Sequence, residues 1–135
     1  MRRLFIILAA LLVAACAQDV DREPAERAVT NFHHRLDAGQ FETIYNEASP
    51  AFRNAVRKDT FLALLASVHG KLGAVKATKQ KRWHTKLGED SAVLTLEYAT
   101  SFVGGDAQER FVWRLESDNV HLDGYQVTST ALDHN

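Results

Sequence analysis

The sequence predicts a single α+β domain in which N-terminal helices pack on a curved, four-stranded antiparallel sheet. Two observations carry this prediction. Up to Gly73 apolar residues recur at helical spacing, whereas after Gly73 they alternate with polar residues at a period of two. Short turn signals separate the alternating runs, which favours hairpins. The 135 residues, 46% hydrophobic and 24% charged, suit one globular domain, expected at 24–131.

Apolar side chains at helical spacing predict three helices, over residues 24–38, 40–47 and 60–72. Pro24 suits the first turn of the first helix, because its missing N–H has no partner there in any case. Ser49 and Pro50 are expected to cap and open one further helical turn. Asp59 or Thr60 is expected to cap the last helix.

Alternation of apolar and polar residues predicts four strands, over residues 74–86, 91–103, 108–117 and 120–129. In the last strand Val120 and Leu122 have one parity, whereas Tyr125 and Val127 have the other. A β-bulge at Gly124 would bring all four side chains onto the same face of the sheet, a common use of glycine inside a strand.

The N-terminus predicts export. Arg2 and Arg3 precede twelve apolar residues, 4–15. As a helix this run spans about 18 Å, which is too short for the ~30 Å core of a membrane. Residues 1–15 are therefore interpreted as a signal peptide, using either the general secretory or the twin-arginine route. Residues 16–23 are polar and are expected to form a flexible tether.

Cys16 is the only cysteine of the chain. The preceding Val13, Ala14 and Ala15 resemble the lipobox of bacterial lipoproteins, in which lipid is attached to the cysteine sulfur before cleavage. The resemblance implies an acylated Cys16 as the first mature residue and membrane anchor. Ala17 implies sorting to the outer membrane, on the leaflet that faces the periplasm. The alternative is ordinary secretory cleavage, with Cys16 incidental.

Two segments resemble a known superfamily. They are FHHRLDAGQFETIYNEASPAFRNAV at 32–56 and FVWRLESDNVHLDGYQV at 111–127. Both are similar to small exported bacterial proteins of the nuclear transport factor 2-like, cystatin-like superfamily, although a tryptophan would be expected at Val120. The resemblance extends over residues 26–130 and implies a cone-shaped α+β fold. The best-matching members have no assigned activity, so it leaves the function open.

No catalytic residue, cofactor or metal site is expected. The six histidines lack ligand spacing, and the adjacent His33 and His34 point about 100° apart on a helix. Enzymes of the superfamily, such as ketosteroid isomerase and scytalone dehydratase, place Asp, His or Tyr inside the cone. The resemblance therefore implies cone-interior candidates, namely Tyr45, Tyr98, Trp113 and Tyr125. No catalytic aspartate motif accompanies them.

The first predicted strand is basic, with no acidic residue between Asp59 and Glu89. The candidates for contact with an anionic partner are Lys76, Lys79, Lys81, Arg82 and Lys86. Strand parity predicts one face shared by Lys76, Thr78, Gln80, Arg82, His84 and Lys86. This stripe would contact lipid headgroups, lipopolysaccharide phosphates or an acidic protein. The simpler interpretation is a solvated edge strand whose lysines prevent aggregation.

These features predict a lipid-anchored binding or accessory module of the envelope, with no evident catalytic site. The alternatives are a small-molecule carrier or enzyme that uses the cone interior, and a structural partner of an envelope complex. Without Arg2 and Arg3 the 16 basic residues fall to 14 against 17 acidic ones, which argues against a nucleic-acid partner. The oligomeric state stays open, a dimer included.

Overall fold

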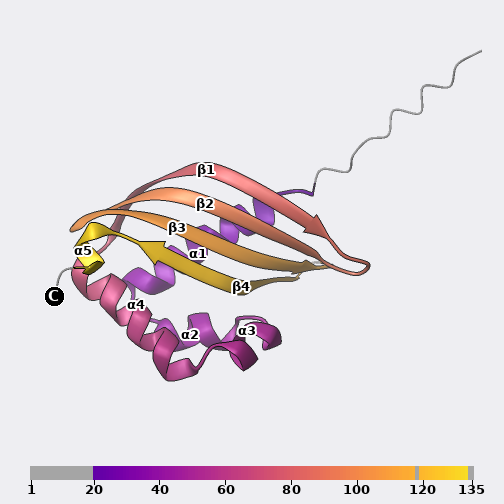
Figure 1. The fold of residues 1–135 in the computed structure, drawn as a ribbon, viewed down its shortest axis with the longest axis horizontal. Helices are drawn as coiled ribbons and strands as arrows, with labels where there is room; N and C mark the ends of the chain where they lie inside the picture. Colours follow the sequence, from indigo (N-terminus) through magenta and orange to yellow (C-terminus); the bar gives the residue numbers. More distant parts are fainter. Residues whose placement is uncertain (1–19, 118, 134–135) are drawn as a thin grey trace, which may run out of the picture.

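The computed structural model describes residues 20–117 and 119–133, and its elements follow the predicted order (Figure 1). The helices α1 (Glu23–Asp37), α2 (Phe41–Asn46), α3 (Pro50–Ala55) and α4 (Lys58–Leu72) come first. The strands β1 (Val75–Leu87), β2 (Ala92–Phe102), β3 (Gly105–Glu116) and β4 (Asn119–Thr128) follow, and α5 (Thr130–Asp133) ends the described chain. The strands form one antiparallel sheet in the order β1-β2-β3-β4. The predicted α+β class is confirmed.

The predicted signal peptide and Cys16 lie outside the described residues. Among the described helices, none is long and apolar enough to cross a membrane.

Local chemistry explains where most helices begin. Pro24 lies in the first turn of α1, as predicted. The Ser49 hydroxyl accepts the N–H of Phe52 at 3.1 Å and caps α3, so the expected turn is a short helix. The predicted cap at Asp59 or Thr60 is wrong, because α4 already begins at Lys58 and Asp59 lies in its first turn. The helix α5 was not predicted, since four residues are too few to show a helical period.

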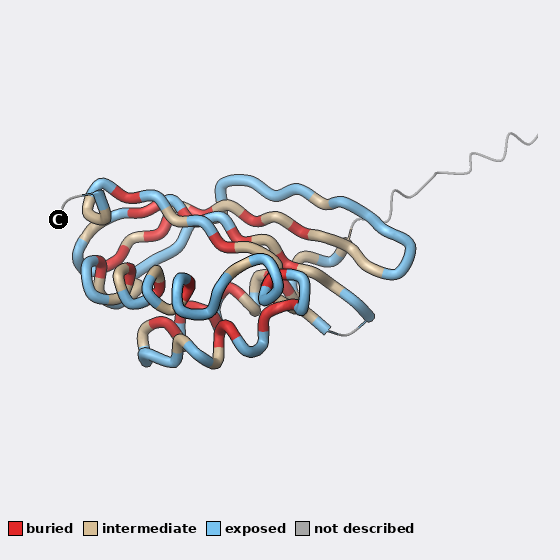
Figure 2. Tube along the Cα trace, turned by 60° about the horizontal axis from the view of Figure 1, so that its bottom comes forward, coloured by how far each residue is buried: buried red, intermediate tan, exposed pale blue. Residues whose placement is uncertain are grey.

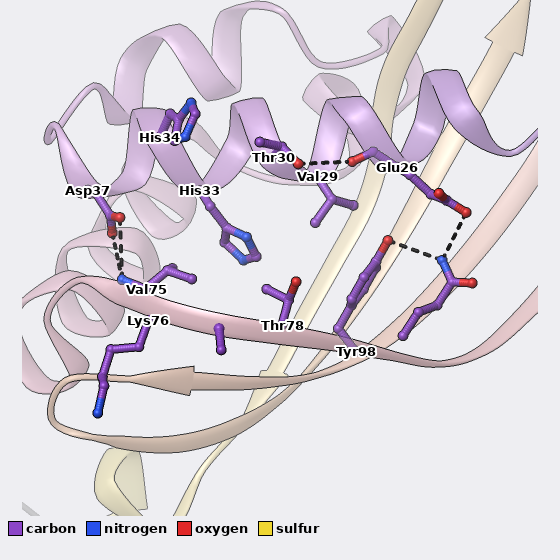
Figure 3. Close-up of a pocket in the computed structure, with 12 residues that line it drawn as sticks. Glu26, Val29, Thr30, His33, His34, Asp37, Val75, Lys76, Thr78 and Tyr98 are labelled. Atoms are coloured by element: carbon purple, nitrogen blue, oxygen red, sulfur yellow. Dashed lines mark hydrogen bonds between the residues drawn. The ribbon is translucent and has the colours of Figure 1, made fainter.

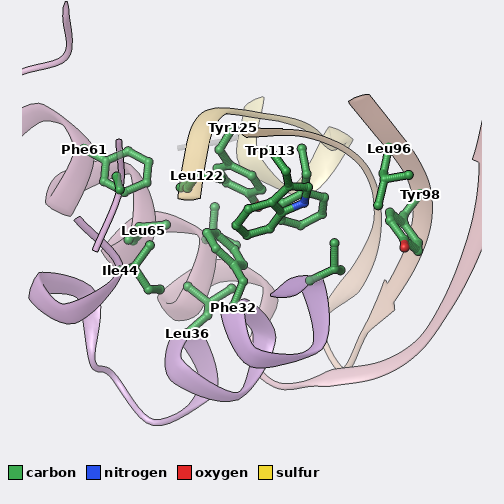
Figure 4. Packing of buried hydrophobic residues seen from close by; sticks show 14 of the residues in the cluster. Phe32, Leu36, Ile44, Phe61, Leu65, Leu96, Tyr98, Trp113, Leu122 and Tyr125 are labelled. Carbon is green, nitrogen blue, oxygen red and sulfur yellow. The ribbon is translucent and has the colours of Figure 1, made fainter. Parts of the chain in front are cut away.

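The core lies between the helices and one face of the sheet, where the buried residues of both layers meet (Figure 2). Aromatic rings fill its centre (Figure 4). Phe111 and Trp113 lie nearly parallel at 5.9 Å between ring centroids, and Phe32 of α1 meets Phe111 edge-on at 5.0 Å. The deep interior of the cone is therefore packed with apolar side chains.

The predicted bulge in β4 is confirmed. Leu122 pairs with Trp113 and Gly124 pairs with Val112, so Asp123 is the extra residue. The bulge places Tyr125 opposite Phe111, on the core face. A Cβ at Gly124 would lie only 3.3 Å from the side chain of Val112, which explains the glycine.

Two bulges in β1 overturn the predicted basic stripe. The register shifts between Val75 and Ala77, and again between Gln80 and Arg82. Thr78 and Gln80 pair with Thr100 and Tyr98 on the helix side of the sheet, whereas Lys79, Arg82, His84 and Lys86 belong to the opposite face. Lys76 and Lys81 are the bulge residues. Strict alternation fails because each bulge reverses the parity of the residues after it.

The turn between β2 and β3 supplies a stability prediction. Gly104 donates its N–H to the carbonyl oxygen of Leu72 at 2.7 Å, and a Cβ there would lie 2.8 Å from the carbonyl oxygen of Lys71. We expect Gly104→Ala to lower the free energy of unfolding by about 1–3 kcal/mol, since the backbone must shift. The control is Gly70→Ala in α4, where a Cβ meets nothing within 4 Å. It should raise stability by roughly 0.5–1 kcal/mol. Urea unfolding measures both, and equal effects would contradict this account.

Candidate functional site

A groove of about 490 Å³ lies between α1 and the edge strand β1 (Figure 3). Its α1 wall carries Glu26, Thr30 and His33, while Thr78 of β1 and Tyr98 of β2 line the other side. The groove exists because, among the strands, α1 packs mainly on β3 and β4, which leaves the helix side of the edge strand β1 uncovered. The small side chain of Thr78 leaves this space open.

One end of the groove is held by a polar network. The Gln80 amide donates to the Tyr98 hydroxyl at 3.2 Å and to a Glu26 carboxylate oxygen at 3.3 Å. The Gln80 carbonyl oxygen accepts a hydrogen bond from Arg22 at 3.1 Å. Burial raises the pKa of Tyr98, with the Gln80 hydrogen bond and Arg22 opposing and Glu26 reinforcing this shift. Tyr98 therefore keeps its proton at neutral pH and can donate a hydrogen bond.

The opposite end is closed by Asp37. Both of its carboxylate oxygens accept the N–H of Val75, at 3.3 Å. This contact ties the end of α1 to the start of β1, so that the two walls of the groove have a fixed separation.

A buried cluster of three polar side chains borders the groove. One oxygen of the Glu109 carboxylate lies 2.7 Å from Nε2 of His33. The other oxygen accepts a hydrogen bond from the Tyr125 hydroxyl at 2.6 Å. His33 is 4% exposed and Glu109 only 1%. Glu109 has the parity of Phe111 in β3 and so points to the core, where the bulge in β4 also delivers Tyr125. We call these three residues the Glu109 cluster.

The Glu109 cluster fixes the orientation of the imidazole. Burial raises the pKa of Tyr125 well above its ordinary value, and the adjacent Glu109 charge and hydrogen bond raise it further, so the phenol stays a donor. In the neutral form of the imidazole, donation from Nε2 to Glu109 leaves a lone pair on Nδ1. The His33 ring lines the groove, and no hydrogen bond among the described residues uses Nδ1. A carboxylate-oriented imidazole of this kind can accept a hydrogen bond or a proton.

The structure separates the four predicted cone-interior residues. Tyr98 lines the groove and Tyr125 belongs to the Glu109 cluster. Tyr45 instead donates to the carbonyl oxygens of Arg53 and Val56, at 3.0 and 2.9 Å, and thereby joins α2 to α3. Trp113 is a core residue stacked on Phe111, so neither it nor Tyr45 takes part in the groove.

Sequence reasoning missed His33, Glu109 and Glu26. Glu109 carried a readable signal, because a charged residue stood at the apolar parity of its strand. His33 also carried one, four residues after the apolar Val29 on the same helix face. For Glu26 the sequence offers no such signal.

The five predicted basic residues are all exposed, with Lys76 at the groove and Lys81 and Arg82 beside Glu97. Over residues 20–117 and 119–133, no group of three or more His, Cys, Asp or Glu side chains could hold a metal ion.

The Glu109 cluster predicts a specific pH dependence. Tyr125→Phe should lower the free energy of unfolding at pH 7 by about 1–3 kcal/mol, because one buried carboxylate oxygen loses its donor. Tyr125 ionises near pH 10 only in the unfolded chain, so wild-type stability should fall as pH rises above about 10. The variant lacks this loss, and the gap between the two proteins should narrow between about pH 9 and 11. Urea unfolding at each pH measures the gap, and a constant gap would contradict the assignment.

Two solved structures share the fold. An NTF2-like protein from Cytophaga hutchinsonii is 15% identical with a TM-score of 0.51, covering 82% of this chain and 99% of that one. A "putative dehydratase" of the NTF2-like family from Streptomyces avermitilis is 16% identical with a TM-score of 0.50, covering 78% and 93%. No curated protein matches the chain. The model of family DUF4019, described as a protein of unknown function, matches residues 28–125, and the chain therefore belongs to this family.

Proposed function

We propose that the protein is a lipid-anchored envelope domain that binds a small polar molecule in the groove between α1 and β1. The observation that carries the proposal is the Glu109 cluster, which turns the His33 ring to the groove wall and leaves Nδ1 without a partner among the described residues. A buried carboxylate is costly, and here its two oxygens are used to orient one donor each. A volume of about 490 Å³ falls in the range of small-molecule sites.

The groove, rather than the deep interior, is the proposed site. Aromatic side chains pack against one another around Trp113 and Tyr125 in the deep interior. The groove wall instead offers hydroxyl groups on Thr30 and Thr78 and the phenol of Tyr98. These groups converge on one space from two elements, which is the pattern of a specific polar site.

The charges of the groove favour a neutral or cationic ligand. Glu26 and Asp37 contribute carboxylates, whereas Lys76 is the one lysine or arginine of the lining residues. A ligand with several N–H or O–H donors satisfies these acceptors. An anionic ligand would meet two carboxylates and would bind less well.

A second candidate function is acid–base catalysis in the same groove. It is favoured by the orientation of His33 through Glu109, the arrangement in which a carboxylate holds an imidazole for proton transfer. Nδ1 of His33 would take a proton from the bound molecule, and the Tyr98 hydroxyl would donate to an oxygen that gains charge. The Streptomyces avermitilis protein with the same fold is named a "putative dehydratase". A ligand released unchanged supports binding, whereas a chemically altered one supports catalysis.

The lipid anchor at Cys16 is proposed from its sequence context. The residues ahead of it match a lipobox, and Cys16 lies only four residues before Val20, where the described chain begins. Acylation would hold the domain at the periplasmic face of the outer membrane.

Blocking the groove tests ligand binding. Thr78→Phe places a ring in the groove from an exposed position, and we expect it to abolish the binding of a small molecule that co-purifies with the wild type. The matched control is Thr95→Phe, because Thr95 pairs with His84 and points away from the helices. Native mass spectrometry should detect an added mass on wild type and control alone. An unliganded wild type, or equal occupancy in all three proteins, would overturn the groove as the site.

Removing the thiol tests the anchor. Cys16→Ser should yield a protein without acyl mass that either keeps its leader or is recovered outside the membrane fraction. Mass spectrometry of the N-terminal peptide and membrane flotation provide the measurement. A wild-type mature chain that carries no lipid, or begins elsewhere, would contradict the anchor and leave the groove untouched.

A further inference from the structure

The end of the β1–β2 hairpin exposes apolar side chains on the helix side of the sheet. Trp83 is 48% exposed and Leu87 is 67% exposed. They pair with Leu96 and Ala92, so they share the face that elsewhere forms the core. The hairpin extends beyond the helices, which leaves this end of the face uncovered (Figures 1 and 2). Trp83 and Leu87 lie four residues apart on the same uncovered face, and exposed apolar side chains at such a place mark a candidate interaction surface.

The chain enters the domain at this same place. The Arg22 guanidinium lies over the Trp83 ring, 4.4 Å from its centroid, and also donates to Gln80. Val20 is the first described residue, and Cys16 precedes it by four residues. Four residues span at most about 14 Å, because an extended chain advances by no more than ~3.6 Å per residue. A membrane that holds Cys16 must therefore lie close to the start of α1 and to Trp83.

The strand that carries Trp83 and Leu87 is basic, which suits phospholipid headgroups. Lys79, Lys81, Arg82 and Lys86 are exposed on β1. Lys79, Arg82 and Lys86 belong to the opposite face of the sheet, but β1 is an edge strand, around which long side chains can reach. Over residues 75–102 five lysines and arginines outnumber three acidic residues, whereas Asp21 and Glu23 offset Arg22. Tryptophan prefers the membrane interface, and long basic side chains reach phosphates from there.

We propose that the outer part of the β1–β2 hairpin lies on the surface of the anchoring phospholipid membrane. Trp83 and Leu87 of the helix-side face would enter the interface, and Lys81, Arg82 and Lys86 would reach the headgroups around the edge of β1. The proposal rests on the anchor at Cys16 and not on the ligand of the groove. A weak surface affinity suffices, because a short tether gives the hairpin a millimolar effective concentration at the bilayer. Arg22 links Trp83 to the groove end, because it lies over the Trp83 ring and donates to Gln80, which in turn contacts Tyr98. This end of the groove would then lie near the headgroups, and its ligand would be taken up beside the membrane.

The protein carries its own reporter for this orientation. It has two tryptophans, of which Trp113 is buried, so the difference between wild type and Trp83→Phe isolates the emission of Trp83. The protein purified from membranes is placed in phosphatidylethanolamine–phosphatidylglycerol vesicles with brominated acyl chains. We expect the Trp83 emission to shift to the blue and to be quenched at least twofold relative to the same vesicles without bromine. A fully solvated Trp83 on protein that floats with the vesicles would overturn the proposal.

Matched variants distinguish membrane contact by the hairpin from nonspecific binding of the protein to vesicles. Leu87→Ser and the double variant Lys81→Glu, Arg82→Glu should reduce the quenching of Trp83. Val103→Ser should leave it unchanged, because Val103 is equally exposed, at 69%, but lies at the other end of the sheet. Equal quenching in all variants would overturn the surface.

A second tethering method distinguishes failure of the surface from failure of the anchor. The chain from Cys16 onward contains every described helix and strand and one thiol, which can be coupled to a maleimide lipid in the same vesicles. Quenching in this coupled protein supports the surface even if cellular protein carries no acyl group, a result that would overturn the anchor alone. Absence of quenching in coupled protein overturns the surface whatever the cellular modification.

Discussion

The buried carboxylate of Glu109 is the constraint on which the arrangement of the site depends. An ion-sized group taken out of water costs several kcal/mol unless its oxygens are paired. Here one oxygen takes the imidazole of α1 and the other takes the phenol of β4. One side chain of β3 therefore connects the first helix to the last strand. This polar pairing specifies one position of α1 along the sheet. Apolar packing alone would define that position less strictly.

The groove follows from that position. Because His33 is drawn to Glu109, α1 lies over β3 and β4 and leaves β1 bare on the helix side. Asp37 and Glu26 then bridge the gap at its two ends, by contacts with the Val75 N–H and with Gln80. A cavity between two fixed walls can be specific for shape and for hydrogen bonding. The same contacts that make α1 stable on the sheet therefore also create the space for a ligand.

A second polar cluster fixes α3 against β4. The bulged Asp123 receives two hydrogen bonds from Arg114, at 3.3 and 3.1 Å, and one from the Ser49 hydroxyl at 2.5 Å. Ser49 also donates its N–H to the carbonyl oxygen of Leu122. The bulge thus does two things at once, since it turns Tyr125 inward and offers a carboxylate that holds α3 against β4. A glycine at position 124 is needed because the bulged strand approaches Val112 closely.

The sequence was sufficient for the element order, the strand pairing and the bulge in β4, because each follows from local periodicity and from one glycine out of phase. It was insufficient for β1, where two bulges fall at lysines and the pattern shows no apolar residue to mark the change of parity. It also missed how residues 33, 109 and 125 pair in the Glu109 cluster, although Tyr125 was expected in the interior and Glu109 stood at an apolar position of its strand. Pairings over such separations depend on the helix position, which no local pattern encodes. Tyr98 could be predicted because its own strand alternates regularly.

Arg22 connects the proposed ligand groove to the end of the β1–β2 hairpin that is proposed to lie on the membrane. Its guanidinium group is held between the Trp83 ring and the Gln80 amide, so movement of one partner changes its contact with the other. If Trp83 enters the headgroup layer, Arg22 can move with it to a phosphate, and Gln80 loses a donor on its carbonyl oxygen. The Gln80 amide in turn holds Tyr98 and Glu26 at the groove end. Contact with the membrane would thereby alter the hydrogen bonding of the groove through one side chain, without any movement of the core.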